Sequence, residues 1–122
     1  IRVGCQTLKL LDRLFPKKIR DKDVQKFWKE FEERADLYLT ILKEDEEDSE
    51  DREWMDVLIK KCLGRVCVDA DEPFGFGFEA GRDPVRFVFR HCGDEFLKKV
   101  GEKLVEFYPK TLAGKIDFIV AE

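Results

Sequence analysis

The chain has 122 residues, of which 43% are hydrophobic and 12% aromatic. A chain of this length folds as one domain and buries roughly two-thirds of its unfolded surface, enough for a core without metals or disulfides. Its net charge of −4 and its pI near 5.2 argue against a general polyanion binder, because such domains are usually basic. No apolar run approaches the roughly 18 residues of a membrane span, and we expect a cytoplasmic protein that does not bind membranes.

Helical spacing of apolar residues predicts two helices in the first third of the chain. The first covers residues 7–15 and ends at Pro16, because a proline ring and its missing N–H stop a helix. After a charged connector, a longer helix over residues 23–43 begins at Asp21 or Asp23, either of which can cap the free N–H groups. Its apolar residues follow steps of three and four along one face: Val24, Phe27, Trp28, Phe31, Ala35, Tyr38 and Leu42.

Residues 44–53 hold eight carboxylates in ten positions. Such a block repels itself, which predicts a solvated loop. Its last acids suit the positive end of a following helix over residues 50–63, with Gly64 at the C-terminal cap. A calcium loop needs a glycine within its series of ligands. None interrupts this series, so we expect no metal site here.

Short apolar runs after Gly64 predict a sheet. Residues 65–70 form a β-branched run typical of a strand, and residues 71–73 end it. Phenylalanines then alternate over residues 74–80, and apolar residues alternate over residues 85–91. With turn residues between the two runs, this pattern predicts a β-hairpin that has one aromatic face.

The end of the chain is predicted to form a helix and a strand. Asp94 leads into a helix with one apolar face, Pro109 stops it, and residues 116–121 form a closing strand. The prediction is a single α+β domain with about four mostly antiparallel strands, covered by helices on one face, in the order α-α-α-β-β-β-α-β. Its parts are a helix and connector (1–22), a helical pair with the acidic loop (23–64) and a sheet with one helix (65–122).

The four cysteines match no zinc pattern, because Cys62 and Cys67 lie five residues apart with no histidine near either. Cys62 falls at an apolar helical position and Cys67 on a predicted strand, where cysteine behaves as a small hydrophobe. The opening residues lack the charged-then-apolar pattern of a secretion signal. Reduced structural thiols are therefore expected, with a disulfide or a redox or metal role as alternatives.

His91 and Cys92 are a base and a thiol that adjoin in the sequence. Neighbours on a strand point to opposite faces, so the two could not act together as base and nucleophile. No serine elbow, phosphate-binding glycine loop or helical histidine pair occurs. The sequence therefore favours a non-catalytic domain without a cofactor, and an enzyme that uses His91 with nearby carboxylates is a further alternative.

The Gly-Phe-Gly-Phe run at residues 75–78 matches the middle of a strand signature found in RNA-recognition motifs. In those domains the glycines keep the strand face open and the aromatic rings stack on bases. Here Phe74 replaces the basic residue of the signature, and Glu79 replaces an apolar residue and would repel phosphate. A sheet whose phenylalanines face the helices is favoured. A single-stranded nucleic-acid-binding module that uses Phe76 and Phe78 stays as the alternative.

A longer pattern extends over residues 27–120. It combines a Phe-Trp-Lys-Glu-Phe run at residues 27–31, strands around residues 76–79 and 87–89, and a helix that ends at Pro109 before the last strand. This pattern is similar to an uncharacterised bacterial family of small α+β domains that begin with a Phe-Trp-x-x-Phe-like motif. The resemblance implies the same fold and a bacterial protein, and it implies no particular activity.

If the phenylalanines of the hairpin face the helices, the other face carries Val88 and two arginines beside Gly75 and Gly77. This surface is shallow and partly basic, which suits a protein partner or an anionic ligand. We expect a non-catalytic protein-interaction or regulatory domain that binds a second copy or another protein, on this face or on the helix over residues 23–43. The candidate binding residues are Arg86, Arg90 and His91.

Overall fold

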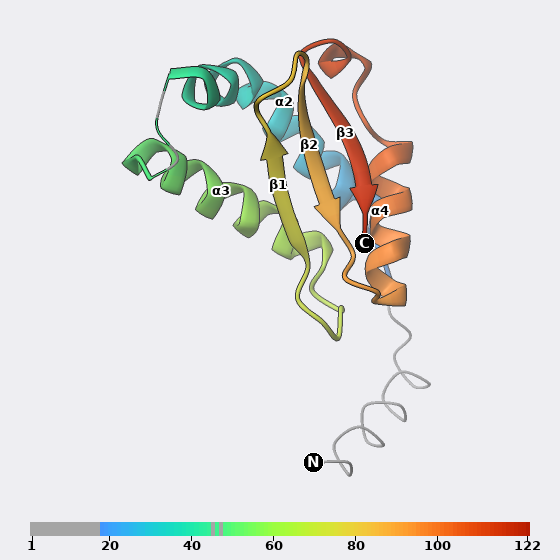
Figure 1. Cartoon of the computed structure of the whole chain (residues 1–122). Helices are drawn as coiled ribbons and strands as arrows, with labels where there is room; N and C mark the ends of the chain where they lie inside the picture. The colour runs from blue at the N-terminus through green and yellow to red at the C-terminus, as the bar shows by residue number, and fades with distance from the viewer. Residues whose placement is uncertain (1–17, 45, 47) are drawn as a thin grey trace.

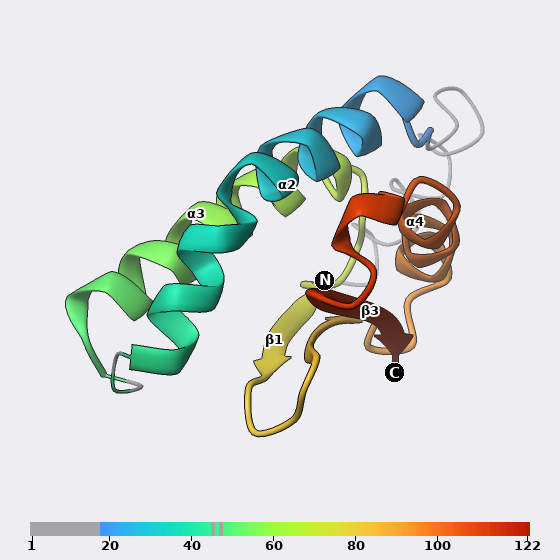
Figure 2. The ribbon, with the colours of Figure 1, turned by 90° about the horizontal axis from the view of Figure 1, so that it is seen from above.

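The computed structural model of the protein describes residues 18–44, 46 and 48–122. The strands form one layer and the helices lie behind them in a second layer (Figures 1 and 2). An α+β fold with helices on one face of the sheet is thereby confirmed, and the helix predicted over residues 7–15 lies outside the described residues. The elements, in chain order, are α2 (Asp21–Glu44), α3 (Glu50–Val66), β1 (Gly75–Glu79), β2 (Val85–Arg90), α4 (Glu95–Glu106), the 3-10 helix η1 (Lys110–Leu112) and β3 (Ile116–Ala121).

Within the described residues the sheet has three strands in the order β1–β2–β3. β1 and β2 pair antiparallel, with Phe76 opposite Phe89 and Phe78 opposite Phe87, which confirms the predicted hairpin. β3 pairs with β2 in parallel, because α4 carries the chain back along the sheet before β3 begins. The sheet is therefore mixed, and the prediction of four mostly antiparallel strands is wrong for this part of the chain.

The strand predicted over residues 65–70 does not form. Instead α3 continues through Gly64 to Val66, and the N–H of the capping residue Cys67 donates to the Leu63 carbonyl oxygen at 3.0 Å. Val66 and Cys67 are buried against the core. Burial of an apolar helix face outweighs the strand preference of a short β-branched run. Gly64 lies inside the helix and does not cap it.

Side-chain caps fix the beginnings of α3 and α4. Ser49 Oγ accepts a hydrogen bond from the Arg52 N–H at 3.1 Å. Asp94 Oδ1 accepts one from the Leu97 N–H at 2.9 Å. Each cap satisfies a donor that the first helical turn leaves free, a contribution of about 1 kcal/mol. α3 thus begins at Glu50, as predicted, and the last acids of the run over residues 44–53 lie in its first turn.

The core lies between the sheet and the helical layer. Phe87 and Phe89 of β2 are fully buried, and the ring of Phe87 stacks on that of Phe27 of α2 with centroids 6.3 Å apart. The Trp28 indole N–H of α2 donates to the Leu104 carbonyl oxygen of α4 at 2.9 Å, which joins two helices through one buried bond. The apolar face of α2 belongs to this core, so it is not available as the partner surface that the sequence had allowed.

Candidate functional site

The face of the sheet opposite the helices is covered by no described element (Figures 1 and 2). Successive side chains of a strand point to opposite faces of the sheet, so this face carries the residues that come before and after the core-facing ones. Strand register arranges these residues in three rows across β1, β2 and β3. The rows are Gly75–Arg90–Ala121, Gly77–Val88–Ile119 and Glu79–Arg86–Asp117, and together they define the outer face.

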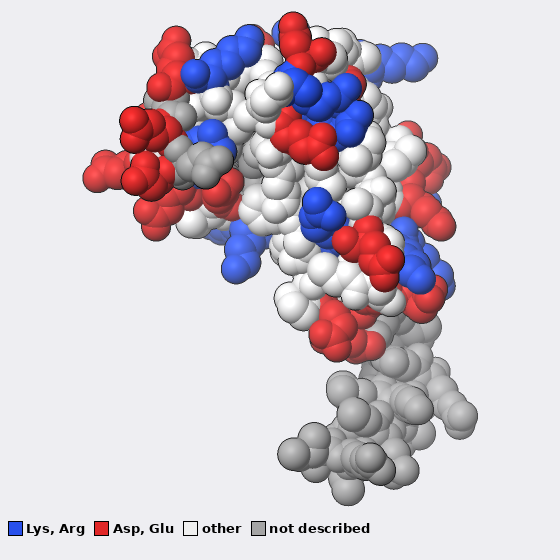
Figure 3. Space-filling view, in the orientation of Figure 1, with Lys and Arg blue, Asp and Glu red and all other residues white. Residues whose placement is uncertain are grey.

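The middle row makes the centre of the outer face apolar and shallow. A β-carbon added at Gly77 would find no atom within 4 Å, so this part of the surface is open. Val88 is buried between its neighbours although it lies outside the core, and Ile119 is partly exposed. Figure 3 shows an uncharged surface over the strands, with charged side chains at its two ends. Flat apolar surface of this kind suits contact with another protein.

One end of the outer face carries two ion pairs. Arg86 Nη1 lies 3.2 Å from Glu79 Oε2, and Arg82 Nη1 from the hairpin turn lies 3.9 Å from Asp117 Oδ2. These side chains are partly exposed, so each pair contributes at most about 1 kcal/mol. Arg86 Nε is buried without a hydrogen-bond acceptor among the described residues. Because that nitrogen has no accessible surface, a partner could not reach it without moving the Arg86 side chain.

The other end of the outer face carries Arg90. This side chain is exposed, and no carboxylate of the described residues lies within ion-pair distance of it. It lies across Gly75 of the neighbouring strand: a β-carbon added there would stand 3.3 Å from the Cβ and 3.6 Å from the Cδ of Arg90. Arg86 and Arg90 thus share one face, and of the two Arg90 has its charge uncompensated.

His91 does not belong to the outer face, because β2 ends at Arg90 and His91 begins a tight loop. Its Nδ1 accepts a hydrogen bond from the Gly93 N–H at 3.0 Å. Cys92 is exposed, has a positive φ of 54° and directs its Sγ to the Arg90 carbonyl oxygen at 3.9 Å. The histidine and the thiol therefore bind different backbone groups and form no base–nucleophile pair.

Phe76 and Phe78, the candidates for base stacking, lie on the side of the sheet that the helices cover. Their ring centroids are 6.3 and 5.1 Å from that of Phe87. Phe78 also stacks on the buried ring of Phe31 of α2 at 6.3 Å, and Phe76 and Phe78 are themselves partly buried. A base-stacking platform needs aromatic rings on an open face, so this placement weighs against the nucleic-acid alternative.

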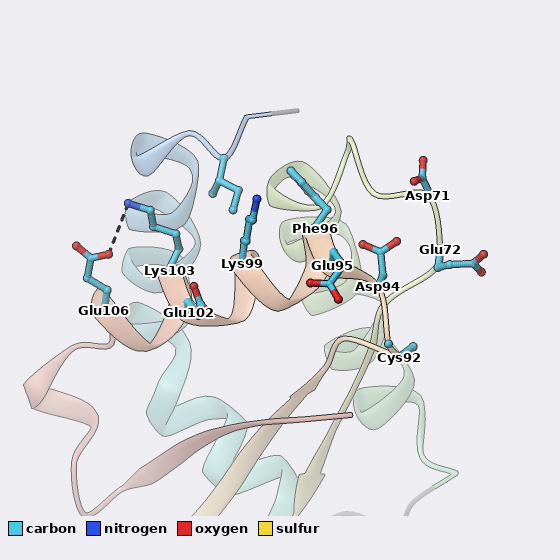
Figure 4. A pocket seen from close by; sticks show the side chains of 12 residues that line it. Asp71, Glu72, Cys92, Asp94, Glu95, Phe96, Lys99, Glu102, Lys103 and Glu106 are labelled. Atoms are coloured by element: carbon cyan, nitrogen blue, oxygen red, sulfur yellow. Dashed lines mark ion pairs between the residues drawn. The ribbon is translucent and has the colours of Figure 1, made fainter. Parts of the chain in front are cut away.

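A groove of about 1000 Å³ runs along α4, between this helix, Ile19 and the loop at residues 71–72 (Figure 4). The sequence did not reveal it, because a loop and a helix far apart in the chain form its walls. Lys103 at one end pairs with Asp21 at 3.2 Å and with Glu106 at 3.5 Å. No group of three metal-ligating side chains occurs among the described residues. His91 is not part of this lining, so the groove does not provide the concave site that a His91-based enzyme requires.

The two buried thiols have structural environments. Cys62 Sγ donates to Glu30 Oε2 at 3.1 Å, and Arg65 Nη1 lies 3.4 Å from Glu30 Oε1. The bond from Cys62, aided by Arg65, holds the pKa of Glu30 below its ordinary value. Burial raises the pKa of Cys62 and raises that of Cys67 to about 12. Both thiols are therefore protonated at neutral pH and unsuited to nucleophilic chemistry.

Comparison of the chain with protein-family models, with curated proteins and with solved structures found no match. The resemblance to a bacterial α+β family stays a prediction. None of the described helices is long and apolar enough to cross a membrane. Since a fold by itself does not define a function, the inference of function rests on the surface of the domain.

Proposed function

We propose that the chain is a non-catalytic protein-interaction domain and that the outer face is its binding surface. The observation that supports this most is the combination, on one uncovered face, of an apolar middle row and the uncompensated charge of Arg90. Small-molecule sites are usually concave pockets with converging polar groups. A flat sheet face with glycines at two of its positions lets the surface of another protein approach closely.

Charge on the outer face indicates the chemistry of the partner. Within the outer face Arg86 and Arg90 balance Glu79 and Asp117. Because Arg86 and the turn residue Arg82 already pair with the two carboxylates, Arg90 carries the positive charge that no described carboxylate offsets. A partner with an apolar ridge and a carboxylate near Arg90 would complement it without breaking an existing ion pair. Such complementarity sets the orientation and the rate of association more than the affinity.

Site-specific photo-cross-linking tests the proposal. A benzoylphenylalanine is placed at Ile119 on the outer face, and as a control at Val105, an exposed residue of α4. In cells of the source organism the full chain should form a defined protein adduct from position 119 and not from position 105. Adducts shared by both positions, or none at position 119, would contradict the proposal.

The affinity of two variants for the partner identified by cross-linking provides a second test of the proposal. Ile119→Asp puts a charge into the apolar row and should weaken binding about tenfold or more, which corresponds to about 1.4 kcal/mol. Val105→Asp makes the same change on α4, and it should bind the partner as the wild-type chain does. Equal affinities of the two variants would place the interface elsewhere.

A further inference from the structure

β1 is an edge strand of the described sheet: it pairs with β2 on one side and with no described strand on the other. The His91 N–H donates to the Ala121 carbonyl oxygen at 3.1 Å, so the odd-numbered residues of β2 turn their backbone groups toward β3. The even-numbered residues turn theirs toward β1. Phe76 and Phe78, which lie opposite odd-numbered residues, therefore direct their N–H and C=O groups to the free edge.

The edge of β1 lacks the usual protection against strand pairing. Soluble proteins blunt their edge strands with lysine, proline or a bulge. β1 reads Gly-Phe-Gly-Phe-Glu, contains neither lysine nor proline, and pairs with β2 in continuous register. Its one charged residue, Glu79, lies at the end of the strand and is paired with Arg86. The edge is thus open to a further strand.

The helical layer extends beyond the sheet on this side. α3 projects past β1 in both ribbon views, so a strand added to β1 would still have a helix behind it (Figures 1 and 2). The same projection disfavours a second copy of this chain as the added strand. A two-fold axis through paired β1 strands would place both α3 helices in one layer, each crossing the shared edge. The arrangement therefore favours an extended segment of another protein.

Side chains of β1 define the chemistry of that segment. On the helix side, the half-buried rings of Phe76 and Phe78 favour apolar residues at two alternate positions of an added strand. On the outer side, Gly75 has no side chain and Arg90 lies across it. A carboxylate opposite Gly75 would meet the Arg90 guanidinium, whereas Gly77 leaves room for any side chain.

We infer that the β1 edge binds an extended segment of a partner protein by strand addition, with two alternate apolar residues on the helix side and an acidic residue opposite Gly75. Main-chain hydrogen bonds would supply affinity and the side-chain contacts specificity, as in other strand-addition complexes. The inference rests on the proposed function, because it names the part of the partner that the domain recognises.

Selection from a display library of random peptides, each about twelve residues long, tests this inference on the full chain. Arg90→Glu and Lys98→Glu serve as parallel baits, the second making the same charge change on α4. The wild-type chain and Lys98→Glu should select peptides with two alternate apolar residues and an adjacent Asp or Glu. Arg90→Glu should select Lys or Arg instead, and should bind the wild-type peptides about tenfold or more weakly.

Amide hydrogen exchange, followed by NMR on the peptide complex, gives the second readout. The Phe76 and Phe78 amides should exchange more slowly once an added strand accepts their hydrogen bonds. Three results would overturn strand addition: no selected peptide, an acid preference that survives Arg90→Glu, or protection confined to α4. If a partner still cross-links at Ile119, the proposed function stands without strand addition. If that cross-link also fails, both proposals are removed.

Discussion

The side chain of Arg90 on β2 lies across Gly75 on β1, so closely that a β-carbon on Gly75 would stand 3.3 Å from Arg90 Cβ. Two residues further along β1, Gly77 leaves the corresponding space empty. The two glycines of one strand thus have different roles. Gly75 makes room for an arginine, and Gly77 leaves the centre of the outer face open.

Alanine at each glycine distinguishes these roles. Gly77→Ala should stabilise the fold by roughly 0.5–1 kcal/mol, because alanine loses less conformational freedom on folding and its methyl group meets no atom. Gly75→Ala should bring no such gain in stability, because the new methyl group would crowd the Cβ of Arg90. Urea unfolding of both variants measures the difference, and equal stabilisation would contradict the described contact.

Gly101 of α4 faces Val120 of β3, and a β-carbon there would lie 2.7 Å from Val120 Cγ1. Gly101→Ala should therefore destabilise the domain by about 1–3 kcal/mol, although alanine is the better helix former. Combining it with Val120→Ala should cost less than the two single changes added together, because the smaller side chain removes the overlap. Strict additivity in thermal or urea unfolding would show that α4 does not pack this closely on β3.

Glu30 should make stability depend on pH. Its pKa in the folded state is lowered from the ordinary 4.5, first by the Cys62 hydrogen bond and then by Arg65. The ionised form therefore stabilises the fold above pH 4.5, and this contribution is lost as the pH falls through the lowered pKa. Glu30→Gln should cost about 1 kcal/mol at pH 7 and progressively less in acid. Glu33→Gln, on the exposed side of the same helix, is the control, and a cost that does not change with pH would refute the described contact.

Thiol reactivity should separate the described cysteines into two classes. Burial raises the pKa of Cys67 to about 12 and that of Cys62 above its ordinary value, whereas Cys92 is exposed. Iodoacetamide at pH 8 should therefore alkylate Cys92 in the native protein and the other two only after unfolding. Peptide mass mapping measures this order. Native alkylation of Cys67 at the rate of Cys92 would contradict its burial.

The periodic spacing of apolar residues in the sequence predicted α2 and the β1–β2 hairpin. The apolar stripe of α2 and the alternating phenylalanines around Phe76 and Phe87 carry their own period, so the helix and the hairpin were found. Val66 and Cys67 were assigned to a strand because their helical state depends on burial against other elements. The direction of β3 likewise depends on where α4 returns the chain.

For the candidate site, too, the sequence predicted what depends on the period of a strand and not what depends on contacts between distant segments. Alternation alone placed Arg86 and Arg90 on one face. The position of Arg90 over Gly75 depends on strand register, and the groove along α4 depends on contacts between distant segments. Neither leaves a periodic signal in the sequence. His91 was assigned to the same surface as Arg90, but β2 ends one residue before it and its ring binds a loop N–H.

Hydrogen exchange of the full chain, with and without the partner identified by cross-linking, tests the proposed interface most directly. Binding at this interface should slow exchange over residues 75–79, where the outer face meets the open edge of the sheet, and leave exchange over residues 95–106 of α4 unchanged. Protection over residues 95–106, with exchange in the strand unchanged, would contradict it and would move the interaction surface to the groove.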